Sequence, residues 1–138
     1  MSTEQNKALI RRYRQIHNSG NLDSLHEIVA QDIVSHNGLP GMPPGLEGGK
    51  MAHNFFNSAF PNTQVTSDDL IAENDRVVER FTAHLTHKGD FMGIPPTGKS
   101  CTVTGMSIFR IANGKIVEHW GQNDGLGLMQ QLGAIPTP

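Results

Sequence analysis

Apolar residues in the first half of the chain recur every three or four positions, which is the period of an α-helix. One such stripe, formed by Leu9, Tyr13 and Ile16, predicts a helix over residues 4–19. Asn21 is a residue type that caps helices, and the apolar positions after it predict a second short helix. Those positions are Leu22, Leu25, Ile28 and Val29.

A third stripe predicts a helix over residues 47–60, which Pro61 ends because the residue before a proline avoids the helical region. Its members are Ala52, Phe55, Phe56, Ala59 and Phe60. This stripe either packs into the core or also forms the floor of a cavity. Residues 33–36 form a short extended segment, and the Gly- and Pro-rich residues 38–45 form a loop that either lines a pocket or connects passively.

After Pro61 the apolar period changes from helical spacing to alternation, which is typical of β-strands. The pattern predicts strands over residues 64–73, 76–87, 100–111 and 115–123. Residues 88–99 form an apolar loop, and residues 125–132 form a last helix. Helices followed by an antiparallel meander indicate the α+β class, with helices on the concave side of a curved antiparallel sheet. We expect a single domain over residues 1–138 with a hollow between the sheet and the helices.

Composition excludes several functions for this chain of 138 residues. The net charge is −2 with no block of like charge, whereas a nucleic-acid-binding protein needs a basic surface. No apolar run approaches the roughly 20 residues that cross a bilayer, so we expect no membrane partner. The single cysteine, Cys101, has no internal disulfide partner, and a reducing cytoplasmic location is expected.

Asn113-Gly114 is a strong hairpin signal, and the strand after it carries the most chemistry. Side chains alternate along a strand, so two sets of residues point to opposite sides. One set is Ile116, Glu118, Trp120, Gln122 and Asp124, and the other is Val117, His119, Gly121 and Asn123. We expect the set with the only tryptophan to look into the hollow, because an aromatic wall ending on a carboxylate suits a flat organic molecule.

Asp124 is the best candidate for an acid or base, and two roles are open to it. It precedes a helix and is a good N-cap, which would hold the carboxylate ionised. If it lies in an aromatic hollow, desolvation raises its pKa and it can exchange protons near neutral pH. His36, flanked by Ser35 and Asn37, is the second catalytic candidate and is otherwise a turn histidine.

Other chemistries find little support in the residue pattern. No His or Cys spacing indicates a metal site, Cys101 has no local partner motif, and phosphate-binding and nucleophile-elbow motifs are absent from the sequence. Arg80 is either on a solvated outer face or buried with a partner such as Glu118 or Asp124. The expected substrate-binding residues are Trp120, Gln122, Phe55, Phe56, Met92, Met106, Tyr13 and Arg80.

Several segments together resemble the SnoaL-like polyketide cyclase family of the nuclear-transport-factor-2-like superfamily. The likeness extends from Lys7 to Gly133. Its segments are residues 60–63 (Phe-Pro-Asn-Thr), 69–73, 75–78, 91–99, 108–111 and 114–120, then Asp124 and residues 126–133. The resemblance implies a cone-shaped α+β barrel with an apolar pocket, a homodimer or homotetramer, and no metal or organic cofactor.

The resemblance also implies a reaction, since the characterised cyclases close the last ring of aromatic polyketides by an intramolecular aldol reaction on a methyl ester. Their acid/base is an Asp that matches Asp124. They also carry a His on the strand before the closing hairpin, and residues 102–110 hold none here. Either His36 or Gln122 takes over that polar role, or the substrate differs.

We therefore expect a cofactor-free enzyme in which Asp124 removes a proton from a small hydrophobic carbonyl compound. The enolate then attacks a second carbonyl of the same molecule. Two alternatives stay open: a binding module of the same fold in which Asp124 only caps a helix, and an isomerase or hydrolase on the same scaffold.

Overall fold

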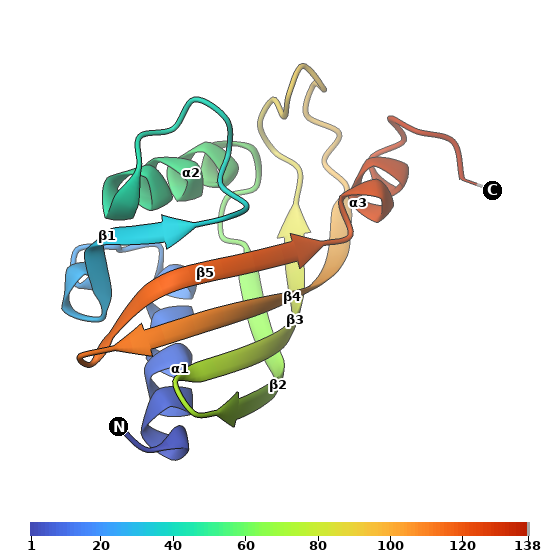
Figure 1. The fold of residues 1–138 in the computed structure, drawn as a ribbon. Coiled ribbons are helices and arrows are strands. Elements are labelled where there is room, and N and C mark those ends of the chain that lie inside the picture. Colours follow the sequence, from blue (N-terminus) through green and yellow to red (C-terminus); the bar gives the residue numbers. More distant parts are fainter. Residues whose placement is uncertain (138) are drawn as a thin grey trace.

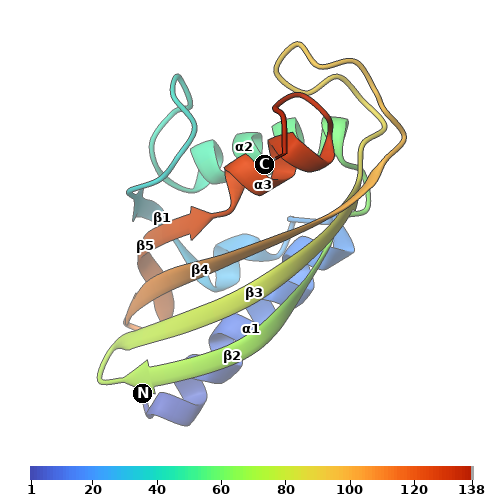
Figure 2. The same cartoon turned by 90° about the vertical axis from the view of Figure 1, so that its right-hand side faces the viewer.

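A curved five-stranded sheet with the strand order β1-β5-β4-β3-β2 organises the protein, and three helices pack against it (Figures 1 and 2). The computed structural model describes residues 1–137. The helices are α1 (Thr3–Ser19), α2 (Gly45–Ala59) and α3 (Gly125–Gln131). The strands are β1 (Val29–Ser35), β2 (Gln64–Glu73), β3 (Arg76–Thr86), β4 (Ser100–Ala112) and β5 (Lys115–Asn123).

The predicted first helix is confirmed, and both of its ends have local causes. The Ser2 hydroxyl accepts a hydrogen bond from the Gln5 backbone N–H, and the Gln5 side chain accepts one from the Ser2 N–H. Gly20 ends the helix in the left-handed region at φ 77°, a conformation that glycine adopts without steric cost.

The predicted second helix is wrong. Only a 3-10 turn, Leu25–Glu27, forms there, and β1 begins two residues later at Val29. The Asn21 side chain accepts a hydrogen bond from the Asp23 N–H and so closes a local turn instead of capping a helix. Leu25, Ile28 and Val29 are all buried, so the apolar stripe packs in the core without helical structure.

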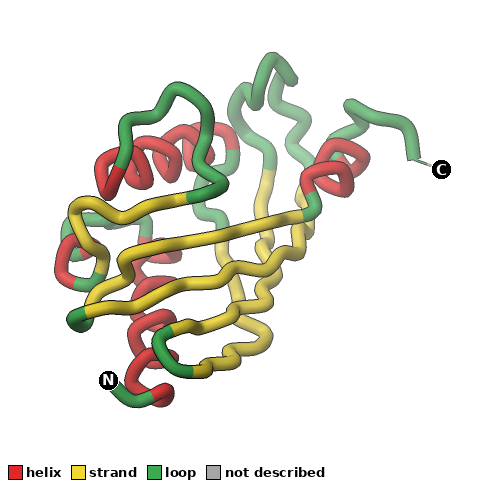
Figure 3. The backbone as a smooth tube through the Cα atoms, in the orientation of Figure 1, coloured by secondary structure: helices red, strands yellow, loops and turns green. Residues whose placement is uncertain are grey.

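The predicted meander of four antiparallel strands is confirmed, and β1, which overlaps the extended segment expected over residues 33–36, adds a fifth strand parallel to β5 (Figure 1). Figure 3 shows the strands side by side as one sheet. The sheet is mixed, because β1 is parallel to β5 and all other neighbouring strands are antiparallel. After β1 the chain passes through α2 and enters the sheet again at β2, on the opposite edge. The loop predicted over residues 88–99 connects β3 to β4, and the last helix forms as expected.

A β-bulge in the closing hairpin determines which side chains face the helices. Ile111 pairs with Ile116, but Arg110 pairs with Glu118, so the register shifts by one residue between Arg110 and Ile111. Ile116 is fully buried in the core, while Glu118 and the residues that alternate with it lie on the outer face of the sheet. A bulge changes the face of every residue beyond it on the bulged strand.

Two apolar clusters hold the layers together. The larger one joins α1 and the 3-10 turn to the sheet and includes Ile10, Ile16, Leu25, Val77, Phe109 and Ile116. The smaller one joins the end of α2 to α3 and the β3–β4 loop through Ala59, Phe60, Phe91, Cys101 and Leu132. Phe60 and Phe91 of the smaller cluster also line the cavity described below.

Candidate active site

A cavity of about 670 Å³ lies between the inner face of the sheet, the C-terminal end of α1, α2 and α3. This volume is in the range of small-molecule sites in proteins. Most of its wall is apolar and includes Phe60, Phe81, Phe91, Val103, Leu128 and Met129. The predicted hollow is therefore present, and it is large enough for a small organic ligand.

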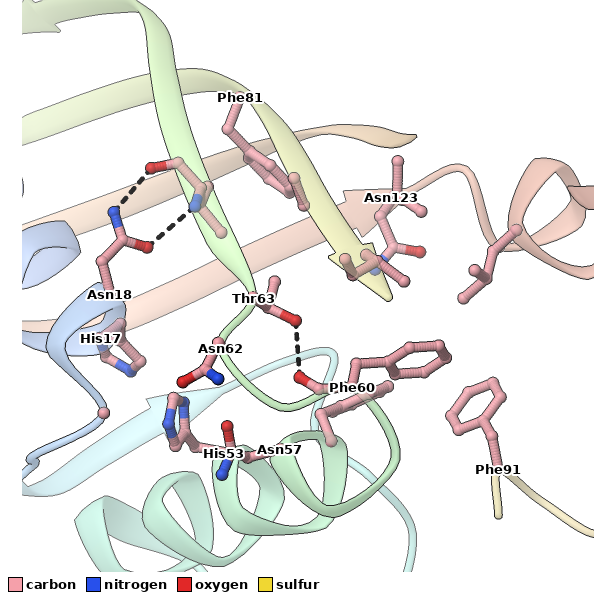
Figure 4. Close-up of a pocket in the computed structure, with 18 of the residues that line it drawn as sticks. His17, Asn18, His53, Asn57, Phe60, Asn62, Thr63, Phe81, Phe91 and Asn123 are labelled. Atoms are coloured by element: carbon pink, nitrogen blue, oxygen red, sulfur yellow. Dashed lines mark hydrogen bonds between the residues drawn. The ribbon is translucent and has the colours of Figure 1, made fainter. Parts of the chain in front are cut away.

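Several polar residues of the cavity gather at one end, whereas Asn123 lies at the other (Figure 4). His17 from α1, His53 and Asn57 from α2, and Asn62 from the turn before β2 point toward one another there. The rings of His17 and His53 are 5.3 Å apart between centroids and nearly perpendicular. Because most of the remaining wall is apolar, this end offers the largest group of hydrogen-bonding side chains to a ligand's oxygen atoms.

His17 is held as a neutral imidazole with a defined tautomer. Its Nδ1 lies 3.0 Å from the carbonyl oxygen of Tyr13, so Nδ1 carries the proton and donates it, and Nε2 keeps a free lone pair. Burial lowers the pKa of His17 to about 4, with a further contribution from the positive charge of Arg14. Burial also lowers the pKa of His53. The Nε2 of His17 is therefore a permanently available proton acceptor at neutral pH.

An ion pair lies beneath the cavity, between α1 and β3. The guanidinium of Arg14 donates from Nε and Nη2 to the two carboxylate oxygens of Glu79, which is fully buried. The Ser67 hydroxyl donates a third hydrogen bond to Glu79, at 2.6 Å. Burial acts to lower the pKa of Arg14, but the hydrogen bonds and charge of Glu79 outweigh it and raise that pKa.

His119 is the β5 residue that faces the helices, not Trp120 as expected. It pairs with Phe109 across the sheet, and the two rings are 4.9 Å apart between centroids. Burial, assisted by the positive charge of Arg14, lowers its pKa to about 4. Asn123, two further alternations along β5, reaches the cavity (Figure 4).

The bulge corrects the expected orientation of the tryptophan face. Trp120 lies on the outer face and stacks on His36 with the ring planes 7° apart. His36 in turn bonds through Nε2 to Glu118 at 2.7 Å, and Arg110 donates to the other oxygen of Glu118 at 2.8 Å. The hydrogen bonds from His36 and Arg110 lower the pKa of Glu118. Neither His36 nor Trp120 lines the cavity, so both predicted cavity positions are wrong.

Three other predicted substrate-binding residues also lie outside the cavity, on the outer face of the sheet. Met106 and Gln122 pair with each other across β4 and β5, and both are exposed. Arg80 is on a solvated face, where it donates to Asp69 at 2.7 Å and lies near Asp68. The solvated alternative for Arg80 is therefore the correct one, and its partners are neither Glu118 nor Asp124.

Among the predicted substrate-binding residues, those on helices and loops agree with the structure more often than those on the strands. Phe56 and Met92 line the cavity, as predicted. Phe56 and Phe60 show that the third apolar stripe forms part of its wall. Phe55 does not line the cavity, so its predicted position is wrong, and its ring packs against those of Phe56 and Phe91. Tyr13 lies one layer deeper and packs against Phe109 and His17, and burial raises its pKa. None of residues 38–45 lines the cavity.

Asp124 is a helix cap in this structure. Its Oδ1 accepts a hydrogen bond of 2.9 Å from the backbone N–H of Gly127 at the start of α3, and the residue is exposed. Its neighbours Asn123 and Gly125 line the cavity, but Asp124 itself does not. The carboxylate therefore lies at the rim and does not point into the apolar interior.

The sequence contained a signal for the residues that were missed. Arg14 and His17 extend an i, i+3, i+4, i+7 series that begins with Ile10 and Tyr13, so they share the buried side of α1. A charged residue and a histidine within such a series indicate a polar group turned toward the interior. Only the folded arrangement adds His53 and Asn62 to the same place.

Two further observations concern metals and membranes. Within residues 1–137, no three His, Cys, Asp or Glu side chains are grouped in a way that could hold a metal ion. No helix in this part of the chain has both the length and the apolar composition needed to cross a membrane.

Comparison with known proteins identifies the family. The model of the SnoaL-like polyketide cyclases matches residues 7–132, so the chain belongs to this family. The resemblance seen in the sequence and the predicted α+β cone fold are thereby confirmed, although the sheet is open on one side and does not close into a barrel.

Individual relatives agree with this assignment. The chain is 29% identical to the aklanonic acid methyl ester cyclase DnrD of Streptomyces peucetius over 94% of this chain and 92% of that protein. It is 28% identical to the cyclase DauD of Streptomyces sp. (strain C5), of the same description, over 94% and 83%. The structure of TsrD from Streptomyces laurentii is similar with a TM-score of 0.88 and 30% identity, over 98% of this chain and 99% of that one.

Proposed function

We propose that the protein is a cyclase that closes a ring in a polyketide-like substrate by an intramolecular aldol reaction. Family membership and the two related aklanonic acid methyl ester cyclases support the cyclase class. The observation that carries the mechanism is a neutral histidine, His17, with a free ring nitrogen in an apolar cavity. This proposal transfers the general-base role from Asp124 to His17.

The chemistry needs only groups that the cavity contains. Nε2 of His17 removes a proton from a carbon flanked by two carbonyls, and the electrons of that C–H bond form an enolate. The enolate carbon attacks a second carbonyl of the same molecule and forms the new C–C bond. The resulting alkoxide takes the proton back from Nε2, so the product is an isomer of the substrate.

The surrounding residues contribute by position. A proton between two carbonyls is already acidic, which lowers the base strength that its removal requires. With a pKa of about 4, His17 stays unprotonated at neutral pH. The apolar wall folds the chain of the substrate and holds its two reacting carbons together, which supplies much of the acceleration by proximity. His53, Asn57 and Asn62 provide hydrogen-bonding groups for the carbonyl oxygens at the polar end of the cavity.

A binding module without catalysis is the second candidate, because Asp124, the acid or base that the sequence predicts, does not line the cavity. In such a module Asp124 would only cap α3, and the hydrogen bond that it accepts from the Gly127 N–H is a cap of this kind. The cavity would then hold a ligand of the same chemistry, and the histidines would serve only as hydrogen-bonding groups.

Incubation with aklanonic acid methyl ester, in buffer without added metal or cofactor, tests the proposal. We expect conversion to a compound of equal mass and different chromatographic retention, with a rate that saturates with substrate. The uncatalysed reaction and the His17→Gln variant are the controls. Saturable binding of the ester with no conversion would instead support the binding module.

We also propose that the outer face of the sheet binds a second copy of the chain. Ile71, Met106 and Val34 from three different strands leave 64%, 59% and 52% of their surface exposed there. The same face also carries the ion pairs Asp69–Arg80 and Glu118–Arg110. A face with both apolar and oppositely charged groups is complementary to itself in a two-fold arrangement.

Sedimentation velocity tests this association. We expect the unmodified protein to sediment as a dimer or tetramer at micromolar concentration and the Met106→Asp variant as a monomer. Met51→Asp is the matched control, since Met51 is similarly exposed on α2, away from the sheet face. A monomeric unmodified protein would contradict the proposal.

A further inference from the structure

Arg14 is the only formally charged side chain among the described residues that line the cavity. Burial lowers the pKa values of His17 and His53 beside it, which disfavours a positive charge on either ring. Its guanidinium carbon lies 5.4 Å from the centroid of the Tyr13 ring and 5.5 Å from that of Phe81. Two aromatic faces and the Glu79 carboxylate therefore fix this cation in one position.

Glu79 uses only part of the guanidinium. Of the five N–H donors of an arginine, two point to Glu79, and none of the residues 1–137 accepts a hydrogen bond from the other three. The hydrogen-bonded edge carries Nε and one hydrogen of Nη2, which leaves Nη1 free. Arg14 lines the cavity, and no group of residues 1–137 occupies these donors.

Arg14 and His17 are three residues apart and so lie on the same side of α1. We propose that Arg14 binds the oxygen of the enolate that forms when His17 removes the substrate proton, and that Arg14 is therefore a catalytic residue. This inference rests on the proposed function. The proton moves from carbon to Nε2 of His17, and the negative charge that develops on the carbonyl oxygen is stabilised by the Arg14 N–H groups.

The role of Glu79 follows from this placement. Without a carboxylate beside it, a cation beneath an apolar cavity would be strongly desolvated and poorly oriented. With Glu79 on one edge, the opposite edge is held ready for an oxygen before the substrate arrives, which is the arrangement that stabilises developing charge best. Ser67 holds Glu79 in turn through its 2.6 Å hydrogen bond.

A pair of small probes separates this role from a structural one. In its ionised form 4-nitrophenol is a flat oxyanion, and 4-nitroanisole is the matched compound that cannot ionise. Affinities for both are measured by absorbance titration at a pH where the phenol is ionised. The proteins compared are the unmodified chain, Glu79→Gln, and the double variant Arg14→Gln/Glu79→Gln, each checked for folding by circular dichroism.

The two variants are expected to change phenolate binding in opposite directions. Glu79→Gln removes the competing negative charge, while the amide oxygen of glutamine can still accept a hydrogen bond that orients Arg14. The change should therefore tighten phenolate binding by about 10-fold, the lower end of the range of one charged hydrogen bond. The double variant has the same net charge as the unmodified protein but lacks the cation, and should bind phenolate about 10- to 100-fold more weakly than Glu79→Gln, the range of one charged hydrogen bond. Nitroanisole affinity should stay within about 2-fold in all three proteins.

Other results overturn the proposal. If phenolate and nitroanisole affinities change in parallel, or if Glu79→Gln shows no saturable phenolate binding, Arg14 only supports the fold. Both of these results can be obtained from Glu79→Gln and the unmodified protein, so the proposal can be overturned even if the double variant fails to fold. The test involves no turnover, so phenolate binding that follows the expected pattern without any cyclisation of the ester would refute the proposed function and leave Arg14 as an oxyanion-binding group.

Discussion

Replacing His17 by glutamine is expected to lower kcat by roughly 10²- to 10⁴-fold, the contribution of a general base. Glutamine can still donate a hydrogen bond toward the Tyr13 carbonyl, but it has no basic nitrogen to replace Nε2. KM should change only a few-fold, because the apolar wall is untouched. Steady-state kinetics with the methyl ester substrate measure both constants.

The pH dependence provides a second measurement on the same residue. A base must be unprotonated to act, and the pKa of His17 is lowered to about 4. The rate of the unmodified enzyme should therefore stay level as the pH falls through the ordinary histidine range near 6.5 and decline only as it approaches about 4. A decline centred near 6.5 would show that the base is a histidine with an ordinary pKa and would argue against His17.

Asp124→Asn is the matched control for the competing assignment. Asparagine caps helices about as well as aspartate, so the stability of α3 should be kept. If Asp124 is only a cap, the variant keeps its activity within a few-fold. A loss of activity comparable to that of His17→Gln would return the role of general base to the rim carboxylate.

Replacing Glu79 by leucine is expected to lower the free energy of unfolding by about 3–5 kcal/mol. The change leaves the Arg14 guanidinium, whose side chain is only 16% exposed, without its partner. It also removes the acceptor of the Ser67 hydroxyl. Urea denaturation followed by circular dichroism measures the loss.

The double variant Arg14→Met/Glu79→Leu distinguishes an unpaired charge from lost packing. Replacing both members of a buried ion pair by apolar residues of similar size is often neutral or stabilising, so the double variant should regain most of the stability. Its cyclase activity should nevertheless be lost if Arg14 binds the enolate. Equal destabilisation of the single and double variants would show that the ion pair does not dominate this region.

Local sequence signals were sufficient for most of the secondary structure. The Asn113-Gly114 turn, with φ values of 52° and 75°, and the alternation on either side of it produced the closing hairpin as predicted. The Gly20 end of α1 and the period-two run of β2 were equally clear. The apolar stripe after Asn21 is the exception, since it predicted a helix that does not form. Its residues lie in a short connection and are buried by contacts with other elements, so their spacing does not reflect a regular local structure.

The site was harder to predict, and the reason is geometric. Alternation along β5 was correctly recognised, but which of the two sets faces inward depends on the register with β4. A bulge of one residue, at a position without a glycine or proline to mark it, reversed the assignment and put Trp120 outside and His119 inside. The assignment of Gln122 failed for the same cause, and Met106 lies opposite it on the same outer face.

The sequence by itself determined the elements, the α+β class, the family and the presence of an apolar cavity, because these follow from residue periods and from segments that are contiguous in the chain. Only the tertiary structure decided which polar groups meet in that cavity. Arg14, His53 and Glu79 are far apart in the sequence, and their proximity depends on the packing of α1 and α2 against the sheet. Periodicity describes each element's own faces, whereas a site requires the relative placement of several elements.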